Sequence, residues 1–237
     1  MNVKQKLNIQ FFSKKVSKMI EMILSGFLFW FIIITNLVSG RFGYDQITFS
    51  ALDPEAKLQK IGNDPKKFKI SVLLILIEHF SIISLVIMLF FVFSPFSIML
   101  AVVWTIFRIG EGLIQIYNKK DYWGLLNIAR KYSGTSGAEK NALIDLGNGI
   151  LKTKNSIFTL TQILFSIGTL AYSILFVTYE VVPPIIGWLG IVASIIYGFA
   201  NGIRPVTPNK ILWSLGGLLI LLFEIVLGGW LIFSPFI

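Results

Sequence analysis

Five ionisable side chains interrupt long apolar stretches of the sequence, and their types could support binding or proton-transfer chemistry. They are Glu78, His79, Arg108, Glu111 and Glu224. A charged side chain within a membrane span costs about 2.5–3.5 kcal/mol, so each of them needs a reason to be there. A buried glutamate can accept a proton or a cation, and a buried arginine can anchor an anion. We therefore predict that these five residues share one polar site.

The charges of this group do not balance. One arginine faces three carboxylates, which leaves a net charge of −2 if all of them are ionised. A low-dielectric interior does not tolerate this excess. Either a carboxylate is protonated, or His79 or a bound cation supplies positive charge, and the group would then titrate as one coupled unit.

Six apolar stretches must position these residues. A helix needs about 20 apolar residues to cross a hydrocarbon layer of roughly 30 Å. The predicted spans cover residues 22–39, 70–93, 97–117, 156–178, 185–203 and 211–233. Their apolar runs are continuous and do not alternate, which argues against a β-barrel. We predict an all-α integral membrane protein, a six-helix bundle that forms a single membrane domain over residues 1–237.

The composition excludes several other classes of protein. Of the 237 residues, 55% are hydrophobic and 14% charged, and the mean hydropathy of +0.77 excludes a soluble or disordered chain. Without cysteine, the chain has no disulfide, thiolate metal site or iron–sulfur cluster, and with one histidine it has no multi-imidazole site. No basic soluble module for nucleic acid is present. We expect no cofactor, no metal and no nucleic-acid partner.

The segments outside the spans are short and polar. Residues 1–18 are typical of an interfacial amphipathic helix that leads into the first span. The alternative is a cleaved signal peptide ending near residues 38–40, although the apolar run is longer than such peptides use. The connections at residues 41–69 and 118–155 lie on the opposite face, and helical periodicity around residues 122–132 and 138–151 predicts helical loops there.

The second and third spans should form a hairpin, because only Ser94-Pro95-Phe96 separates them. At about 1.5 Å of rise per residue, Glu78 and Arg108 then lie roughly 12 and 13 Å below the face with the polar connections, and Glu111 about 9 Å. Glu224 lies deeper, at about 20 Å. We predict that Arg108 contacts a carboxylate and that the group lines a cavity enclosed by spans two to six, open toward this face, with Glu224 as its floor.

Uncharged polar residues extend this site along three helices. The third span carries Thr105 and Gln115 on the face of Arg108 and Glu111, the fourth carries Thr159, Gln162, Ser166, Thr169 and Ser173, and the fifth carries Ser194, Tyr197 and Asn201. Such stripes face the bundle interior, because lipid offers no hydrogen bonds. To the pocket we assign, besides the five ionisable residues, Gln115, Gln162, Ser166, Tyr197 and Asn201.

Structural alternatives to this site stay open on the sequence alone. The stripes could be packing faces, and Arg108 with Glu111 could be a structural pair three residues apart on one helix. His79 fits a helix–helix hydrogen bond better than a metal site, because it points about 100° away from Glu78.

Several motifs occur in an order typical of one family. They are Phe107-Arg108-Ile109-Gly110-Glu111-Gly112, then Phe165-Ser166-Ile167-Gly168 with Tyr172 and Pro183, then Phe223-Glu224 with Trp230-Leu231-Ile232, and the acid Glu78 in the second span. Together they resemble the bacterial and archaeal membrane proteins called domain of unknown function 4386, over about residues 19–235. Pro184 and Ser234-Pro235 depart from the family pattern. The resemblance implies six spans and a polar core, but no activity.

Orientation and location follow from the charges. Five lysines lie on the N-terminal side, whereas the opposite connections carry fifteen Lys and Arg residues, so a positive-inside count places those connections in the cytoplasm. The charges that flank the first span and the family resemblance instead favour a cytoplasmic N-terminus. We choose a multi-pass protein of the cell membrane with a cytoplasmic N-terminus. The net charge of +9 indicates attraction to anionic headgroups, so membrane lipids are its expected partners.

Three classes of function remain. The buried charges favour a protein that binds or moves a small polar or amphiphilic ligand, a proton or a cation, although the chain shows no internal repeat of the kind found in many transporters. A structural or accessory membrane subunit is the alternative. An enzyme acting on a lipid or isoprenoid is less favoured, since the sequence has no nucleophile motif and no acidic metal-binding motif.

Overall fold

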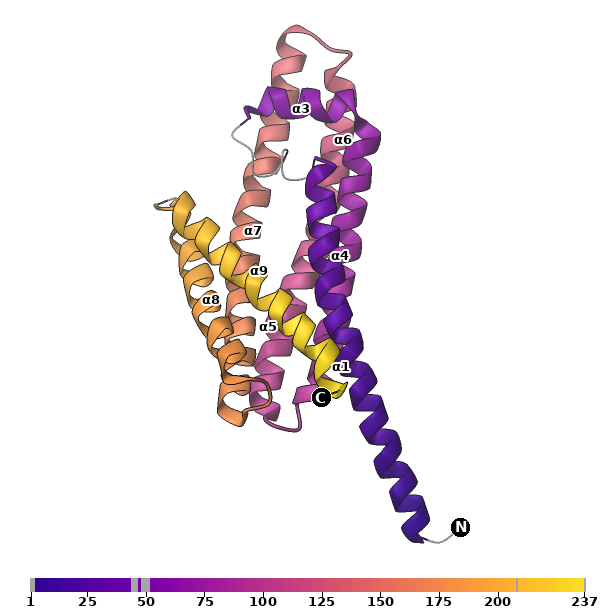
Figure 1. Ribbon diagram of the computed structural model, residues 1–237. Helices are drawn as coiled ribbons and strands as arrows, with labels where there is room; N and C mark the ends of the chain where they lie inside the picture. Colours follow the sequence, from indigo (N-terminus) through magenta and orange to yellow (C-terminus); the bar gives the residue numbers. More distant parts are fainter. Residues whose placement is uncertain (1–2, 44–46, 48–51, 208, 237) are drawn as a thin grey trace.

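A computed structural model describes residues 3–43, 47, 52–207 and 209–236, and all regular structure in these residues is helical (Figure 1). Six of the helices are long and apolar enough to cross a membrane. This confirms the predicted six-span, all-α membrane fold. The elements are α1 (Val3–Arg41), α3 (Pro54–Asn63), α4 (Pro65–Phe93), α5 (Ile98–Asn118), α6 (Lys120–Tyr132), α7 (Gly137–Tyr179), α8 (Pro184–Ile203), α9 (Lys210–Phe233) and the 3-10 helix η1 (Ser234–Phe236).

Local capping explains where several helices begin. The Asp53 and Asp64 carboxylates accept hydrogen bonds from the backbone N–H groups of Ala56 and Lys67, and a proline follows each aspartate. Proline suits the first helical position, because its missing N–H group would have no partner there. Asn209 caps α9 in the same way.

Two helices differ in extent from the predicted spans. α1 runs without a break from Val3 to Arg41, so the predicted N-terminal arm and the first span are one helix. α7 begins at Gly137, so its 43 residues extend about 64 Å, roughly twice the hydrocarbon thickness. The N-terminal part of α7 therefore reaches beyond the membrane and packs with α3 and α6. We call α3, α6 and residues 137–155 of α7 the cap.

The two parts of the molecule have separate apolar cores. In the bundle, large side chains including Leu85, Tyr172, Phe176, Phe223 and Leu227 form one buried cluster. In the cap, a second buried cluster gathers side chains from α3, the start of α4, α6 and α7. The cap is thus a packed helical unit. It holds in place the start of α4, the end of α5 and the extramembrane part of α7.

Helix α9 crosses α1 closely near its own C-terminal end (Figure 1). A Cβ atom added to Gly26 of α1 would lie 2.5 Å from the Gly228 carbonyl oxygen and 2.6 Å from Ile232 Cγ1. Trp30 Nε1 donates a hydrogen bond of 3.2 Å to the Ile225 carbonyl. Glycine at the contact permits this approach, as in other membrane helix pairs.

In the cap, Glu55 joins three helices. Its carboxylate accepts hydrogen bonds from the Tyr132 hydroxyl of α6, at 2.5 Å, and from the Lys140 ammonium of α7, at 2.9 Å. The Tyr132 hydrogen bond and then Lys140 hold the pKa of Glu55 below its ordinary value of 4.5. Stabilisation by this group is therefore present above about pH 4.5 and is lost as the pH falls through the lower folded-state pKa.

We expect Gly26→Ala to lower the free energy of unfolding by about 1–3 kcal/mol, because the new methyl group would separate α1 from α9. Gly149→Ala is the matched control, since a Cβ atom at Gly149 meets nothing within 4 Å and alanine favours a helix by up to about 1 kcal/mol. Thermal unfolding in detergent, monitored by tryptophan fluorescence, gives the midpoint of each variant. Equal midpoints for the two variants would contradict the close crossing.

Acidification should loosen α3 before the bundle unfolds. Hydrogen exchange of residues 54–63, measured from about pH 6 to about pH 3 and corrected for intrinsic rates, should show protection that falls only below about pH 4.5, as Glu55 becomes protonated. Glu55→Gln should give weaker protection that no longer changes over this range. The control Glu139→Gln removes an exposed carboxylate of α7 and should behave like the unchanged protein. The same fall in the Glu55→Gln variant would show that other groups cause it.

Candidate functional site

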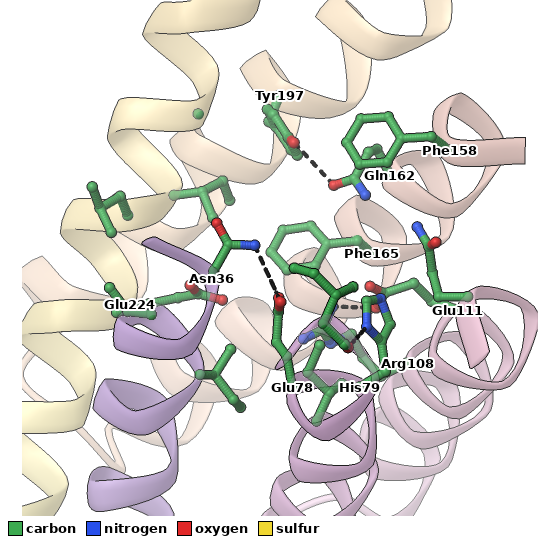
Figure 2. A pocket seen from close by; sticks show the side chains of 18 of the residues that line it. Asn36, Glu78, His79, Arg108, Glu111, Phe158, Gln162, Phe165, Tyr197 and Glu224 are labelled. Carbon is green, nitrogen blue, oxygen red and sulfur yellow. Dashed lines mark hydrogen bonds and ion pairs between the residues drawn. The ribbon is translucent and has the colours of Figure 1, made fainter. Parts of the chain in front are cut away.

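Six helices surround a cavity of about 380 Å³ within the bundle (Figure 2). This volume lies in the range of about 300–1,000 Å³ that is usual for small-molecule sites. α1, α4, α5, α7, α8 and α9 all contribute to its wall. The predicted site residues that line it are Glu78, His79, Arg108, Glu111, Gln115, Gln162, Tyr197 and Glu224.

Arg108 and Glu111 form a buried ion pair on α5, which confirms that Arg108 contacts a carboxylate. Both are almost fully buried, with exposed fractions of 2% and 4%. The guanidinium also lies over the Phe165 ring, 4.3 Å from its centroid, which adds a cation–π attraction. Among the described residues, Arg108 Nε has no hydrogen-bond partner. The arginine thus retains one unused donor, and this donor atom is itself buried.

Close packing of α7 against α5 holds the Arg108 side chain in position. A Cβ atom added to Gly168 of α7 would lie 2.9 Å from Arg108 Cγ. Glycine therefore lets α7 approach α5 at the level of the ion pair, so the stem of the arginine packs against the α7 backbone.

Glu78 of α4 is held by a residue that the sequence analysis did not select. Asn36 of α1 donates its Nδ2 hydrogens to both carboxylate oxygens of Glu78, at 3.2 Å each (Figure 2). Glu224 of α9 reaches the same cavity. Within the part of the chain that the structure describes, neither Glu78 nor Glu224 belongs to an ion pair.

The first span is therefore a wall of the cavity, in addition to the predicted spans two to six. Asn36 is an amide side chain in an otherwise apolar run, and this was the available sequence signal. Asn36 was missed because the first span was not expected to reach the site, and only α1–α4 packing brings Asn36 to Glu78.

Lys119 is the second cavity residue that the sequence analysis missed. It follows the predicted end of the third span, but α5 continues to Asn118, and Lys119 is only 2% exposed. Its ammonium donates to Gln115 Oε1 at 3.3 Å. Lys119 lies four residues after Gln115 and eight after Glu111, so helical spacing could have placed it on the same face. The cavity thus holds two cations and three carboxylates, an excess of one negative charge if all are ionised.

Two predicted site residues, Ser166 and Asn201, do not line the cavity. The Ser166 hydroxyl donates to the Gln162 carbonyl of its own helix, and Asn201 Nδ2 donates to the Tyr197 carbonyl. Ser173 and Ser194 bond to their own helices in the same way. For these residues the stripes of the fourth and fifth spans are packing faces, because a hydroxyl satisfied by its own helix lets α7 and α8 lie close together.

The uncharged cavity residues tie neighbouring helices together. The Tyr197 hydroxyl of α8 donates to Gln162 Oε1 of α7 at 2.9 Å, and Gln115 Nε2 of α5 donates to Thr161 Oγ1 of α7 at 2.6 Å. His79 Nδ1 lies 2.6 Å from the Ile75 carbonyl oxygen, which can only accept, so Nδ1 carries a hydrogen. The neutral ring then offers Nε2 as an acceptor. Among the described residues, no group of three His, Asp or Glu side chains could hold a metal ion.

Comparison with known proteins agrees with this architecture. The family described as "Domain of unknown function (DUF4386)" matches residues 24–234, and the chain belongs to this family of multi-pass membrane proteins. A search of curated proteins and a search of solved structures return no match.

Removing Arg108 should strand the buried Glu111 carboxylate. We expect Arg108→Ala to lower the free energy of unfolding by about 3–5 kcal/mol, measured by titration with SDS in mixed micelles. The double variant Arg108→Ala/Glu111→Ala should lose less than the sum of the two single variants, because neither charge is then left alone. Arg130→Ala, which removes an exposed arginine of α6, is the control and should change little. Additive effects at positions 108 and 111 would rule out a coupled pair.

Proposed function

We propose that this membrane protein binds a small ligand bearing an amine or another cationic group, with Glu78 and Glu224 as the counter-charges. The observation that carries the proposal is that two carboxylates outside any described ion pair line one cavity in the membrane-spanning part of the chain. A charge buried without a partner is strongly unfavourable. One bound cation would balance the excess charge of the cavity.

The hydrogen bonding of Glu78 is compatible with an ionised carboxylate. Both of its carboxylate oxygens accept from Asn36 Nδ2. An ionised carboxylate only accepts hydrogen bonds, whereas a protonated one would offer a donor at one oxygen. The Asn36 arrangement therefore suits ionised Glu78, and an ionised carboxylate in this setting attracts a positive group.

The pairing of Arg108 argues against a simple anion site. Glu111 already neutralises the arginine, and an anion placed in the cavity would also meet Glu78 and Glu224. Lys119 also lines the cavity, beside Gln115, and can contact an uncharged or anionic portion of a larger ligand. The chemistry thus fits a ligand whose cationic group is essential and whose other polar groups are secondary.

The alternative function is that of an accessory subunit with a purely structural core. The cavity argues against this alternative. Packing alone favours a filled interior, because native cores leave few voids larger than a water molecule. A cavity of about 380 Å³ lined by charged residues is more characteristic of a binding site.

Ethylammonium is a suitable probe of this proposal, with acetate as the probe of opposite charge. In purified protein, ethylammonium should raise the thermal midpoint, and at 100 times its Kd the stabilisation should reach about 2.7 kcal/mol. Glu78→Gln and Glu224→Gln should each abolish the shift, since each removes one counter-charge. The matched control Glu139→Gln, which alters an exposed cap residue, should keep it. A shift with acetate, or none with either ion, contradicts the proposal.

A further inference from the structure

Helix α9 packs against different partners along its length. Near its C-terminal end it lies against α1, through Gly228 and the carbonyl of Ile225. Near its N-terminal end it lies against α8, where a Cβ atom added to Gly216 would be 2.9 Å from Tyr197 Cα. α1 and α9 therefore diverge from their crossing, with α9 leaning toward α8, as Figure 1 shows.

The cavity reaches into the space between these diverging helices. Ile33 and Leu37 of α1 line it from one side, and Gly217 and Leu221 of α9 line it from the other. Leu37 lines the cavity although its side chain is 61% exposed, so this residue stands where the cavity meets the outside of the bundle. We call the space between residues 33–37 of α1 and 217–221 of α9 the side opening.

The surroundings of the side opening are apolar. Ile34 of α1 and Leu218 of α9, next to the lining residues, are 58% and 62% exposed on the outer surface. Both belong to candidate membrane spans, Lys15–Arg41 and Lys210–Phe233. In a membrane, exposed leucine and isoleucine of a span face lipid chains, so the side opening would lead into hydrocarbon.

From this geometry we infer that the ligand is an amphiphile from the bilayer: its amine-bearing head occupies the cavity, and its hydrocarbon chain leaves through the side opening. This inference rests on the proposed function, because Glu78 and Glu224 select the amine. It differs from the opening toward the polar connections that the sequence suggested. A charged cavity beside an apolar exit matches the two ends of such a molecule.

The absence of cysteine from the sequence makes the side opening directly testable. Leu37→Cys places one thiol at the rim, and Ile34→Cys places one on the same exposed side of α1 but outside the cavity lining. Each is labelled with the same bulky maleimide. Native mass spectrometry then compares bound phosphatidylethanolamine with phosphatidylglycerol of identical chains, which lacks the amine.

In the unlabelled protein and in the labelled Ile34→Cys variant, phosphatidylethanolamine should be retained over phosphatidylglycerol by about tenfold. In the labelled Leu37→Cys variant this preference should disappear, because the label fills the path of the chain. The thermal shift with ethylammonium is measured in the unlabelled protein and in the labelled Ile34→Cys variant, where it should be the same, because Ile34 lies outside the cavity lining. Dodecylammonium, tested in the same way, separates a requirement for the amine alone from a requirement for a phospholipid.

Each negative result contradicts a different part of the inference. If ethylammonium binds but both phospholipids and dodecylammonium are retained equally by the two labelled variants, the side opening is wrong and the proposed function stands. If ethylammonium binds and the amine gives no preference among amphiphiles, the ligand class is wrong. If ethylammonium does not bind the unlabelled protein, the proposed function itself fails.

Discussion

The buried ion pair of Arg108 and Glu111 is the interaction on which the interior of this protein depends. A guanidinium in a low-dielectric bundle requires a counter-charge and close packing, and the structure supplies both through Glu111, the Phe165 ring and the glycine at position 168. Because Glu111 is committed to this pair, Lys119 and the two remaining carboxylates define the charge of the cavity. The ion pair thus determines which groups are left to meet a ligand.

Small residues make that interior possible at the level of whole helices. Glycines at positions 26, 168 and 216 let α1, α7 and α9 approach their neighbours at three separate contacts. The cavity occupies the space where α9 leaves α1 for α8, so the same glycines that tighten the bundle also define its hollow part. The close helix contacts and the cavity therefore both follow from the way α9 is placed between α1 and α8.

The cap explains why the polar end of α5 can remain buried. Lys154 of α7 donates to Asn118 and forms an ion pair of 2.7 Å with Asp121, directly beside Lys119. These residues sit where the bundle meets the cap, and α6 packs over them. A single membrane span ending at this point would expose Lys119 to water. The continuation into α6 and α7 instead encloses its ammonium group beside Gln115.

Run length, helical period and the cost of a charge in hydrocarbon are local properties, so they predicted the six spans, the helical cap segments and most of the charged residues of the cavity. The sequence also predicted the Arg108 contact, since a buried guanidinium requires a partner. Only the tertiary structure brought Asn36 to Glu78 and enclosed Lys119, as both depend on contacts between helices far apart in the chain. It also assigned Ser166 and Asn201 to packing. Their hydroxyl and amide groups could turn to the cavity or to their own helix, and the position of the neighbouring helix decides between the two.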